Sequence, residues 1–400
     1  MKIIYLIPEA CYPENTGGRI VVYNKIKYLS YLGNELYIFS IIDNNDEEQQ
    51  MKIGVNKYVK ECHCYNRKSK FANRFKGIFR LPYAVTSRTN GSLINDIEKT
   101  ILETPIDIVI CELPQMAGNI VELKRKYGFK AVLSEQNVEY QSMRNIGSRF
   151  KNPIKKYVYL WDSKKMESFE RELYHRNIFD AYFFVSRDDE NTFNTLINKN
   201  RKPTTVVPIG NEDHKISVIN KFNENAIIVG KMSYPPNIEG VIWFVKNVWP
   251  LVTKKCGSAK LFIVGKDPAD SIRELESNSV QVTGTVDSVE PYYRNASVAI
   301  VPLFSGGGVK TKLIEATSYN IPTVCTKFGA VGTCYENNKD MVITDDVTSF
   351  AEAVISSLKG DSFPNEMAEH AHKKFMENYN WKGICIHLNN FLNGICKIGD

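Results

Sequence analysis

This 400-residue chain lacks any apolar run near the roughly 20 residues that a membrane-spanning helix requires. It also lacks low-complexity tracts and fixed-period repeats, and its apolar and charged fractions, 43% and 24%, are those of a globular protein. The apolar start, Met1–Pro8, is too short for a secretory signal. These absences exclude a membrane-spanning, fibrous or disordered protein and predict a soluble, cytoplasmic one.

Metal-binding patterns are also missing. Apart from His63, the histidines form no metal-ligand pattern with cysteines, and the nine cysteines are scattered and odd in number, which favours reduced thiols over a disulfide framework. Cys62-His63-Cys64 resembles half a zinc site, but no second pair stands at a matching spacing, so a strand is favoured. No Asp-x-Asp metal motif stands in the expected place, and we expect neither an obligatory metal nor a cofactor.

Charge and glycine patterns exclude two further classes. The net charge of +6 is only mildly basic, so we expect no nucleic-acid partner. No Gly-x-Gly-x-x-Gly follows the first predicted strand, which disfavours a dinucleotide dehydrogenase.

What the sequence does have is an alternation of strand-like apolar runs and helical patterns, which predicts βα units and parallel sheets. A length of 400 residues suits two domains of about 200 residues each. In the first half, strands are predicted at Ile3–Ile7, Glu35–Ile42, Asp107–Cys111, Ala131–Ser134, Ala181–Ser186 and Thr205–Asn211. Helical patterns there cover Ile20–Leu32, Gly91–Glu103, Gly118–Tyr127 and Lys155–Asn177.

The alternation restarts after a polar stretch, Glu212–Asn225, that is typical of a linker. Strands are predicted at Ala226–Gly230, Lys260–Val264, Val280–Thr283, Val298–Leu303, Thr323–Thr326 and Met341–Thr344, and helices near Phe350–Leu358 and Pro364–Leu392. The fold class is therefore α/β, with two Rossmann-like, doubly wound domains facing across a cleft. We predict domains at 1–212 and 225–378, and a C-terminal helix at 379–400 that packs back on the first domain.

The most informative segment is Pro302-Leu-Phe-Ser-Gly-Gly-Gly-Val-Lys-Thr-Lys-Leu-Ile-Glu-Ala316. Its glycines permit close approach of the backbone to a ligand, and the helix that follows begins with two lysines. A glutamate one turn later can accept hydrogen bonds from the hydroxyls of a ribose. The segment predicts a site for a nucleoside diphosphate that carries a sugar. A tight strand-to-helix turn with solvated lysines remains the alternative.

At this point the chain resembles the GT-B glycosyltransferases of family 4, in their bacterial polysaccharide and cell-surface-glycan branch. The resemblance covers nearly the whole chain and rests on four motifs in order. These are Glu14-Asn-Thr-Gly-Gly18; Gly230-Lys-Met-Ser-Tyr-Pro-Pro-Asn237 with Trp243-Phe244; Val264-Gly265 and Gly284-Thr-Val286 with Tyr292-Tyr293; and Gly306 to Ala316 with Ile321-Pro-Thr-Val324.

The resemblance implies a set of site residues. Lys231, Lys310 and Lys312 would stabilise the leaving group, and Glu112 and Gln136 would lie on the acceptor side. The donor would be bound by Gly17, Gly18, Gly284, Thr285, Val286, Gly306, Gly307, Gly308, Val309 and Glu315.

Four features depart from the family pattern: Gly307 and Gln136, as well as Lys231 in place of a frequent arginine and Pro236-Asn237 in place of a usual Lys-Gly. Gly307 stands where most of the family has the first of two glutamates, and Gln136 stands where relatives have a histidine. The first departure removes an acidic contact to the donor sugar, and the second removes the obvious general base of the first half.

The resemblance implies sugar transfer from a nucleotide sugar, UDP- or GDP-linked, to a glycan or lipid-linked acceptor, with retention and in surface-glycan synthesis. A sugar-nucleotide epimerase is a second hypothesis, although the scarcity of histidine disfavours it. A non-catalytic partner protein with the same fold is a third, which the departures at Gly307 and Gln136 favour.

Residues 68–80 interleave Lys and Arg with Phe71, Phe75 and Phe79 at four-residue spacing. A helix of this pattern carries an apolar stripe between cations and favours an anionic membrane surface, here the inner face of the membrane. A surface helix that packs the three phenylalanines onto its own domain explains the same pattern. Peripheral membrane contact through 68–80 is therefore a hypothesis with an open alternative.

Overall fold

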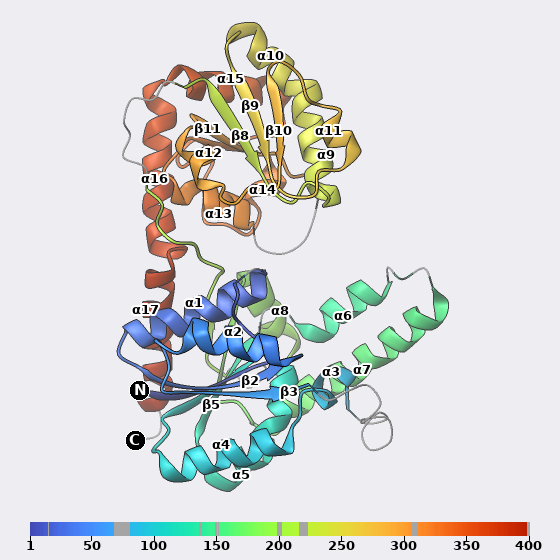
Figure 1. Ribbon diagram of the computed structural model, residues 1–400, viewed down its shortest axis with the longest axis vertical. Helices are drawn as coiled ribbons and strands as arrows, with labels where there is room; N and C mark the ends of the chain where they lie inside the picture. Colours follow the sequence, from blue (N-terminus) through green and yellow to red (C-terminus); the bar gives the residue numbers. More distant parts are fainter. Residues whose placement is uncertain are drawn as a thin grey trace. The chain divides into compact units, whose positions relative to one another are not determined.

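The fold is described from a computed structural model of the chain (Figure 1). The structure describes residues 1–14, 16–67, 81–135, 138–148, 150, 152–197, 202–215, 223–305 and 310–397. It divides into two compact units, one formed by Met1–Pro208 with Ile384–Asp400 and the other by Ile209–Gly383.

The first unit contains a parallel sheet, which in the described residues has seven strands in the order β3-β2-β1-β4-β5-β6-β7. The winding reverses between β1 and β4, and ligands bind in such sheets beside the carboxyl ends of the strands at this switch point. The strands are β1 (Lys2–Ile7), β2 (Glu35–Ile42), β3 (Glu61–Asn66), β4 (Ile108–Glu112), β5 (Lys130–Glu135), β6 (Ala181–Phe184) and β7 (Thr204–Val206).

Helices cover both faces of this sheet, with α1 and α2 on one face and α4 and α5 on the other (Figure 1). The central strands are therefore buried on both sides and read as continuous apolar runs instead of alternating ones. The helices are α1 (Gly17–Tyr31), α2 (Asn45–Val55), α3 (Tyr83–Thr86), α4 (Gly91–Glu103), a 3-10 helix (Pro114–Asn119), α5 (Val121–Tyr127), α6 (Glu139–Ser148), α7 (Pro153–His175) and α8 (Arg187–Leu196).

The last helix, α17 (Trp381–Lys397), is counted with the first unit from Ile384 onward. There the amide of Asn34 donates to the Asn389 side chain at 2.9 Å. The Cys396 thiol lies 3.9 Å from the sulfur of Met1.

The second unit repeats the architecture with a six-stranded parallel sheet, β10-β9-β8-β11-β12-β13, in the described residues. Its strands are β8 (Asn225–Val229), β9 (Lys260–Val264), β10 (Val280–Gly284), β11 (Val298–Val301), β12 (Thr323–Cys325) and β13 (Val342–Ile343). Its helices are α9 (Pro235–Trp243), a π-helical segment (Phe244–Val248), α10 (Trp249–Lys255), α11 (Asp270–Arg273), α12 (Glu290–Arg294), α13 (Thr311–Ser318), α14 (Lys327–Ala330), α15 (Val347–Lys359) and α16 (Ser362–Asn378). Here the switch point lies between β8 and β11.

The predicted fold class is confirmed, and the strand at Cys62–Cys64 is present as β3. The helical pattern Pro364–Leu392 is present as α16 and α17, with a break at Tyr379–Asn380. The backbone of Asn211 pairs with Tyr379 and Trp381 on either side of Asn380, at 2.8 and 3.2 Å, and this pairing separates α16 from α17. No helix in the described part of the chain is long and apolar enough to cross a bilayer.

Candidate functional site

The switch point of the second unit brings together two segments that are distant in the sequence. The loop 230–234 leaves β8 and leads into α9, while the chain after β11 leads to α13. Lys231 lies in the first segment, and Lys310, Lys312 and Glu315 lie in the second. The residues predicted to contact the donor therefore converge where an α/β sheet of this order binds ligands.

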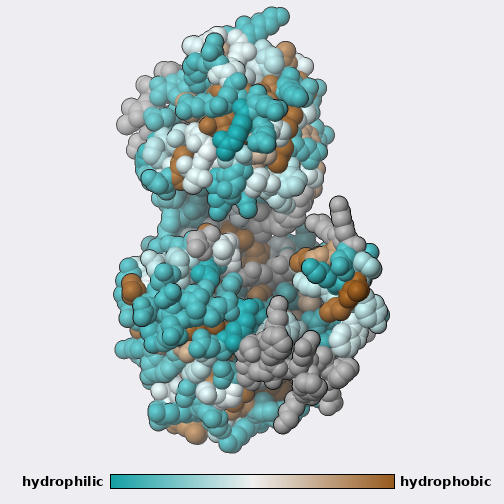
Figure 2. Space-filling model, turned by 45° about the vertical axis from the view of Figure 1, so that its right-hand side comes forward, coloured by the Kyte–Doolittle hydropathy of each residue, from teal (hydrophilic) through white to brown (hydrophobic). Residues whose placement is uncertain are grey.

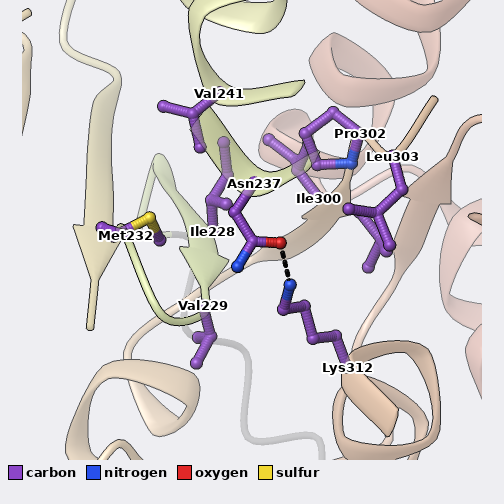
Figure 3. Close-up of a pocket in the computed structure, with 10 residues that line it drawn as sticks. Ile228, Val229, Met232, Asn237, Val241, Ile300, Pro302, Leu303 and Lys312 are labelled. Carbon is purple, nitrogen blue, oxygen red and sulfur yellow. Dashed lines mark hydrogen bonds between the residues drawn. The ribbon is translucent and has the colours of Figure 1, made fainter. Parts of the chain in front are cut away.

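Lys312 reaches across this point to α9, where its ammonium donates a hydrogen bond to the side-chain oxygen of Asn237 (Figure 3). The amide nitrogen of Asn237 in turn donates to the carbonyl oxygen of Lys231 at 2.7 Å. Burial lowers the pKa of Lys312 to about 8, and the neighbouring carboxylate of Glu315 opposes this shift. The lysine is thus held by a neutral partner in a partly desolvated place, where a phosphate would gain most from its charge.

Glycines make this close approach possible. A Cβ on Gly230 would lie 2.7 Å from Cε of Lys312 and 3.0 Å from the amide nitrogen of Asn237. A Cβ on Gly265 would lie 1.6 Å from the carbonyl oxygen of Gly230, and the φ of Gly265 is +151°. The backbones of the loops after β8 and β9 therefore contact each other directly at Gly230 and Gly265. The side chain of Lys312 occupies the space beside Gly230.

A small cavity of about 10 Å³ lies beside the Lys312–Asn237 pair (Figure 3). Such a volume holds about one water molecule and no nucleotide. It is lined by Ile228, Val229, Met232, Asn237, Val241, Ile300, Val301, Pro302, Leu303 and Lys312. Its apolar walls shield one side of the lysine from solvent, which is the burial that lowers the pKa of Lys312.

Glu315 follows Lys312 by three residues on α13, so the two side chains share one face of the helix. Burial raises the pKa of Glu315 to about 7, against a hydrogen bond from the hydroxyl of Tyr293 and the positive charge of Lys312. The Tyr293 ring stacks on the Tyr319 ring with 4.3 Å between centroids. The His214 ring also stacks on Tyr319, with 4.8 Å between centroids. This aromatic stack fixes the hydroxyl that holds the carboxyl group of Glu315.

The other two predicted lysines have different surroundings. Lys310 is buried with its ammonium 4.1 Å from the ring centre of Phe328 on α14, and burial lowers its pKa. The side chains of Lys310 and Lys312 therefore contact different elements, although the charge of Lys310 contributes to the lowered pKa of Lys312. Lys231 has an exposed side chain, while its carbonyl oxygen accepts from Asn237.

The loop after β10 carries the predicted residues Gly284, Thr285 and Val286. Gly284 has a φ of +70°, a left-handed conformation that other residues adopt at a cost, so the turn itself requires glycine. Thr285 is exposed, and Val286 packs partly buried beside the Tyr293 cluster. The sequence motif is thus explained by the turn, and its donor contact stays a prediction.

Several predicted residues lie outside the described part of the chain. They are Gly306, Gly307, Gly308, Val309 and Gln136, together with the segment 68–80.

In the first unit, the predicted glycines lie at the start of α1. Gly17 is the first residue of the helix and is exposed, and a Cβ there would meet no heavy atom within 4 Å. A Cβ on Gly18 would make an ordinary contact at 3.7 Å with the carboxylate of Glu9. Neither residue is among those with positive φ. The described residues give no steric reason for glycine at these two positions. Close approach of a ligand to the backbone would be such a reason.

Glu112 is fully buried at the end of β4, where its carboxylate is 3.3 Å from the ammonium of Lys25. It also accepts hydrogen bonds from the hydroxyls of Ser134, at 2.9 Å, and Tyr5. The group thus joins β1, β4, β5 and α1 inside the core, and this role explains it without a substrate. Its predicted place on the acceptor side has no support from this geometry.

A second group of acids surrounds the end of β5. Glu170 on α7 accepts the backbone N–H groups of Glu139 and Tyr140 at 3.1 Å each, and burial raises its pKa to about 8. Burial also raises the pKa of Glu135 and of Glu139, and Glu139 accepts a hydrogen bond from Gln115 at 3.0 Å. The carboxyl group of Glu170 thus caps the N-terminus of α6 and ties it to α7.

Sequence reasoning did not assign roles to Asn237 and Gly230, although both lie in a quoted motif. Asn237 was noted only as a departure from the family pattern. The usable signal is that Gly230 directly follows a buried strand and Asn237 follows two prolines, in the first turn of α9. Their partner Lys312 is 75 residues away from Asn237, and no local pattern reveals that pairing.

The chain is similar to known proteins in sequence and in fold. Residues 223–360 match the family model "Glycosyl transferases group 1". A Klebsiella pneumoniae protein described as an "Uncharacterized 44.6 kDa protein in cps region" is 25% identical over 399 residues, covering 96% of this chain and 97% of that protein.

Solved structures show the same fold over nearly the whole chain. A glycosyltransferase from Rickettsia africae has a TM-score of 0.65 and 13% identity, covering 99% of both chains. Anabaena Alr3699/HepE, solved in complex with UDP, has a TM-score of 0.64 and 10% identity, covering 98% of this chain and all of that one. The chain therefore has the GT-B fold of glycosyltransferases, and its residues 223–360 belong to the Glycosyl transferases group 1 family.

Proposed function

We propose that this protein transfers a sugar from a nucleotide donor to a glycan or lipid-linked acceptor, with retention, in surface-polysaccharide synthesis. The observation that carries the proposal is the Lys312–Asn237–Glu315–Tyr293 arrangement at the switch point of the matched domain. A relative encoded in a cps region supports the polysaccharide assignment, and a neighbour solved with UDP supports a nucleotide donor.

In this proposal Lys312 and Lys231 stabilise the diphosphate as it leaves. The acceptor oxygen forms its bond to the anomeric carbon on the face from which the phosphate departs. The bond from that carbon to the phosphate oxygen breaks, and the acceptor proton passes to the departing phosphate. No protein base is then required. Fixed cations at the leaving group are the efficient means of stabilising such charge, and losing one such contact costs about 3 kcal/mol of barrier.

Glu315 has a different task. Its carboxyl group is held by the hydroxyl of Tyr293 and faces the same side of α13 as Lys312. A carboxylate accepts hydrogen bonds from two neighbouring hydroxyls, which suits the ribose or the donor sugar.

Other predicted residues remain proposed contacts of the donor. They are Lys310, whose ammonium lies on the ring of Phe328, and the glycines at 17, 18 and 306–308. We further propose that the reaction needs no divalent metal and that the protein works in the cytoplasm at the membrane face, with 68–80 as one proposed contact.

The proposal is tested by thermal unfolding with UDP, GDP and their sugar conjugates, since a ligand of the folded state raises the unfolding temperature. One nucleotide should raise it in the parent and not in Lys312→Ala. Release of that nucleotide from its sugar conjugate should then require an acceptor. Conversion of the donor sugar without acceptor would indicate an epimerase instead. Absence of stabilisation by every nucleotide would refute the proposed site.

A further inference from the structure

The tip of the α6–α7 pair carries several exposed apolar side chains on one face. Ile154, Tyr157, Val158 and Trp161 on α7 are between 37% and 74% exposed. Their spacing of three, four and seven residues puts them on one side of the helix. Ile146 and Phe150, near the turn between the helices, are also exposed. A helix of a soluble domain normally turns such a face inward, so this face indicates an interaction surface.

The two helices of the tip pack against each other. Figure 1 shows α6 and α7 side by side, extending away from the sheet of the first unit. The two helices approach closely at Gly147, where a Cβ would lie 3.1 Å from the side chains of Tyr159 and Leu160. The ring of Phe150 packs edge-on against Tyr159 at 5.3 Å. Hydrophobic and hydrophilic residues lie next to each other on this projecting part in Figure 2.

The same tip concentrates positive charge. Its described residues include five lysines or arginines, Arg144, Lys155, Lys156, Lys164 and Lys165, and one acid, Asp162, a net charge of +4. Arg144 pairs with Glu167, two residues beyond the tip on α7. The single acid, Asp162, is 2.6 Å from the ammonium of Lys165, while Lys155, Lys156 and Lys164 are exposed.

We propose that the tip of α6 and α7, residues 144–165, docks on an anionic lipid bilayer. Aliphatic side chains with Tyr and Trp suit the boundary between headgroups and acyl chains, and lysine stems extend from there to the phosphates. Each lysine near an anionic bilayer contributes about 1 kcal/mol of attraction. A second copy of the chain is a poor occupant, because two positively charged tips repel each other.

This surface is separate from residues 68–80 and does not depend on the proposed sugar transfer. It is tested with the full chain and vesicles of phosphatidylcholine, with or without phosphatidylglycerol. The parent should sediment with the anionic vesicles only. Emission of Trp161 should shift to the blue on binding, and the shift should vanish in Trp161→Phe, since Trp249 and Trp381 are buried and Trp243 packs on Phe304 and Phe350 in the other unit.

Two sets of variants locate the surface. The triple variant Ile154→Gln, Tyr157→Gln, Val158→Gln should lower the bound fraction at least about tenfold. Its matched control, Tyr31→Gln, Ile53→Gln, Leu102→Gln, removes residues of the same unit that are 64% to 76% exposed and should bind like the parent. Changing Lys155, Lys156 and Lys164 to Gln should weaken binding, while changing them to Arg should preserve it.

The inference fails if the parent does not bind anionic vesicles, or if the control triple loses as much binding as the α7 triple. It also fails if the parent is a dimer in sedimentation and the α7 triple is a monomer with no vesicle binding, which would assign the face to a second copy. Nucleotide stabilisation should be the same in every one of these variants, so failure of docking and failure of the donor site are distinguishable.

Discussion

Lys312 on α13 is fixed by the side-chain oxygen of Asn237 on α9, and Asn237 is fixed by the backbone of Lys231. The contact uses a neutral partner. The positive charge of Lys312 is therefore positioned without being neutralised, and it stays available to an anion. A carboxylate in the same place would satisfy the lysine and leave less for a phosphate.

Asn237→Asp tests this relationship. The new carboxylate should pair with Lys312, raise its pKa and weaken the binding of the nucleoside diphosphate about tenfold, as expected for repulsion of phosphate by an added charge at close range. Isothermal titration with the nucleotide measures the change. Asn247→Asp, which adds the same charge at an exposed position of the same unit, is the control and should bind like the parent. Equal affinity in both variants would contradict the proposed role of Lys312.

Gly230→Ala tests the space that the lysine occupies. The added methyl group would lie 2.7 Å from Cε of Lys312, so the flexible lysine must move while the strands keep their pairing. Nucleotide affinity should fall about tenfold or more, with little change in the unfolding temperature in the absence of ligand. Gly257→Ala is the matched control, because a Cβ there meets nothing within 4 Å. A large loss of stability in Gly230→Ala without ligand would show that the glycine serves packing instead.

Much of the fold follows from local sequence. The strands Glu35–Ile42 and Lys260–Val264 were predicted with their observed bounds, because buried parallel strands are apolar runs with polar residues at their ends. The break at Tyr379–Asn380 could not be predicted in this way. It depends on pairing with Asn211, a residue far away in the sequence, whereas the local pattern around the break is helical.

The sequence predicted which residues form the site but not where their side chains point. Lys310, Lys312 and Glu315 could be identified after the glycines from their residue types and spacing. That Lys310 turns to Phe328 while Lys312 turns to Asn237 depends on which elements pack beside α13. The same holds for Glu112. The local sequence of a glutamate at the end of a strand is the same whether its side chain contacts a ligand or a buried lysine.

The buried pair of Lys25 and Glu112 yields a stability prediction. Lys25→Met leaves the carboxylate in the core without its cation and should lower the free energy of unfolding by about 3 to 5 kcal/mol. The double variant Lys25→Met, Glu112→Gln removes the unpaired charge and should recover a large part of this loss. Urea denaturation of the two variants and the parent measures both effects. A Glu112→Gln variant with unchanged stability and no transfer activity would instead return Glu112 to the acceptor side.

Glu315 makes stability depend on pH in a predictable direction. Its pKa is about 7 in the folded protein and near 4.5 in the unfolded chain, so the folded state holds the proton more tightly. Its contribution is fully present below pH 4.5 and is lost as the pH rises through 7, a loss on the order of 3 kcal/mol. Glu315→Gln cannot titrate, so it should gain stability relative to the parent between pH 5 and 8. Exposed Glu352→Gln is the control and should follow the parent. Unfolding free energies at several pH values measure the difference, and parallel curves for the parent and Glu315→Gln would show that the pKa of Glu315 is the same in the folded and unfolded protein, against the raised value that burial gives it.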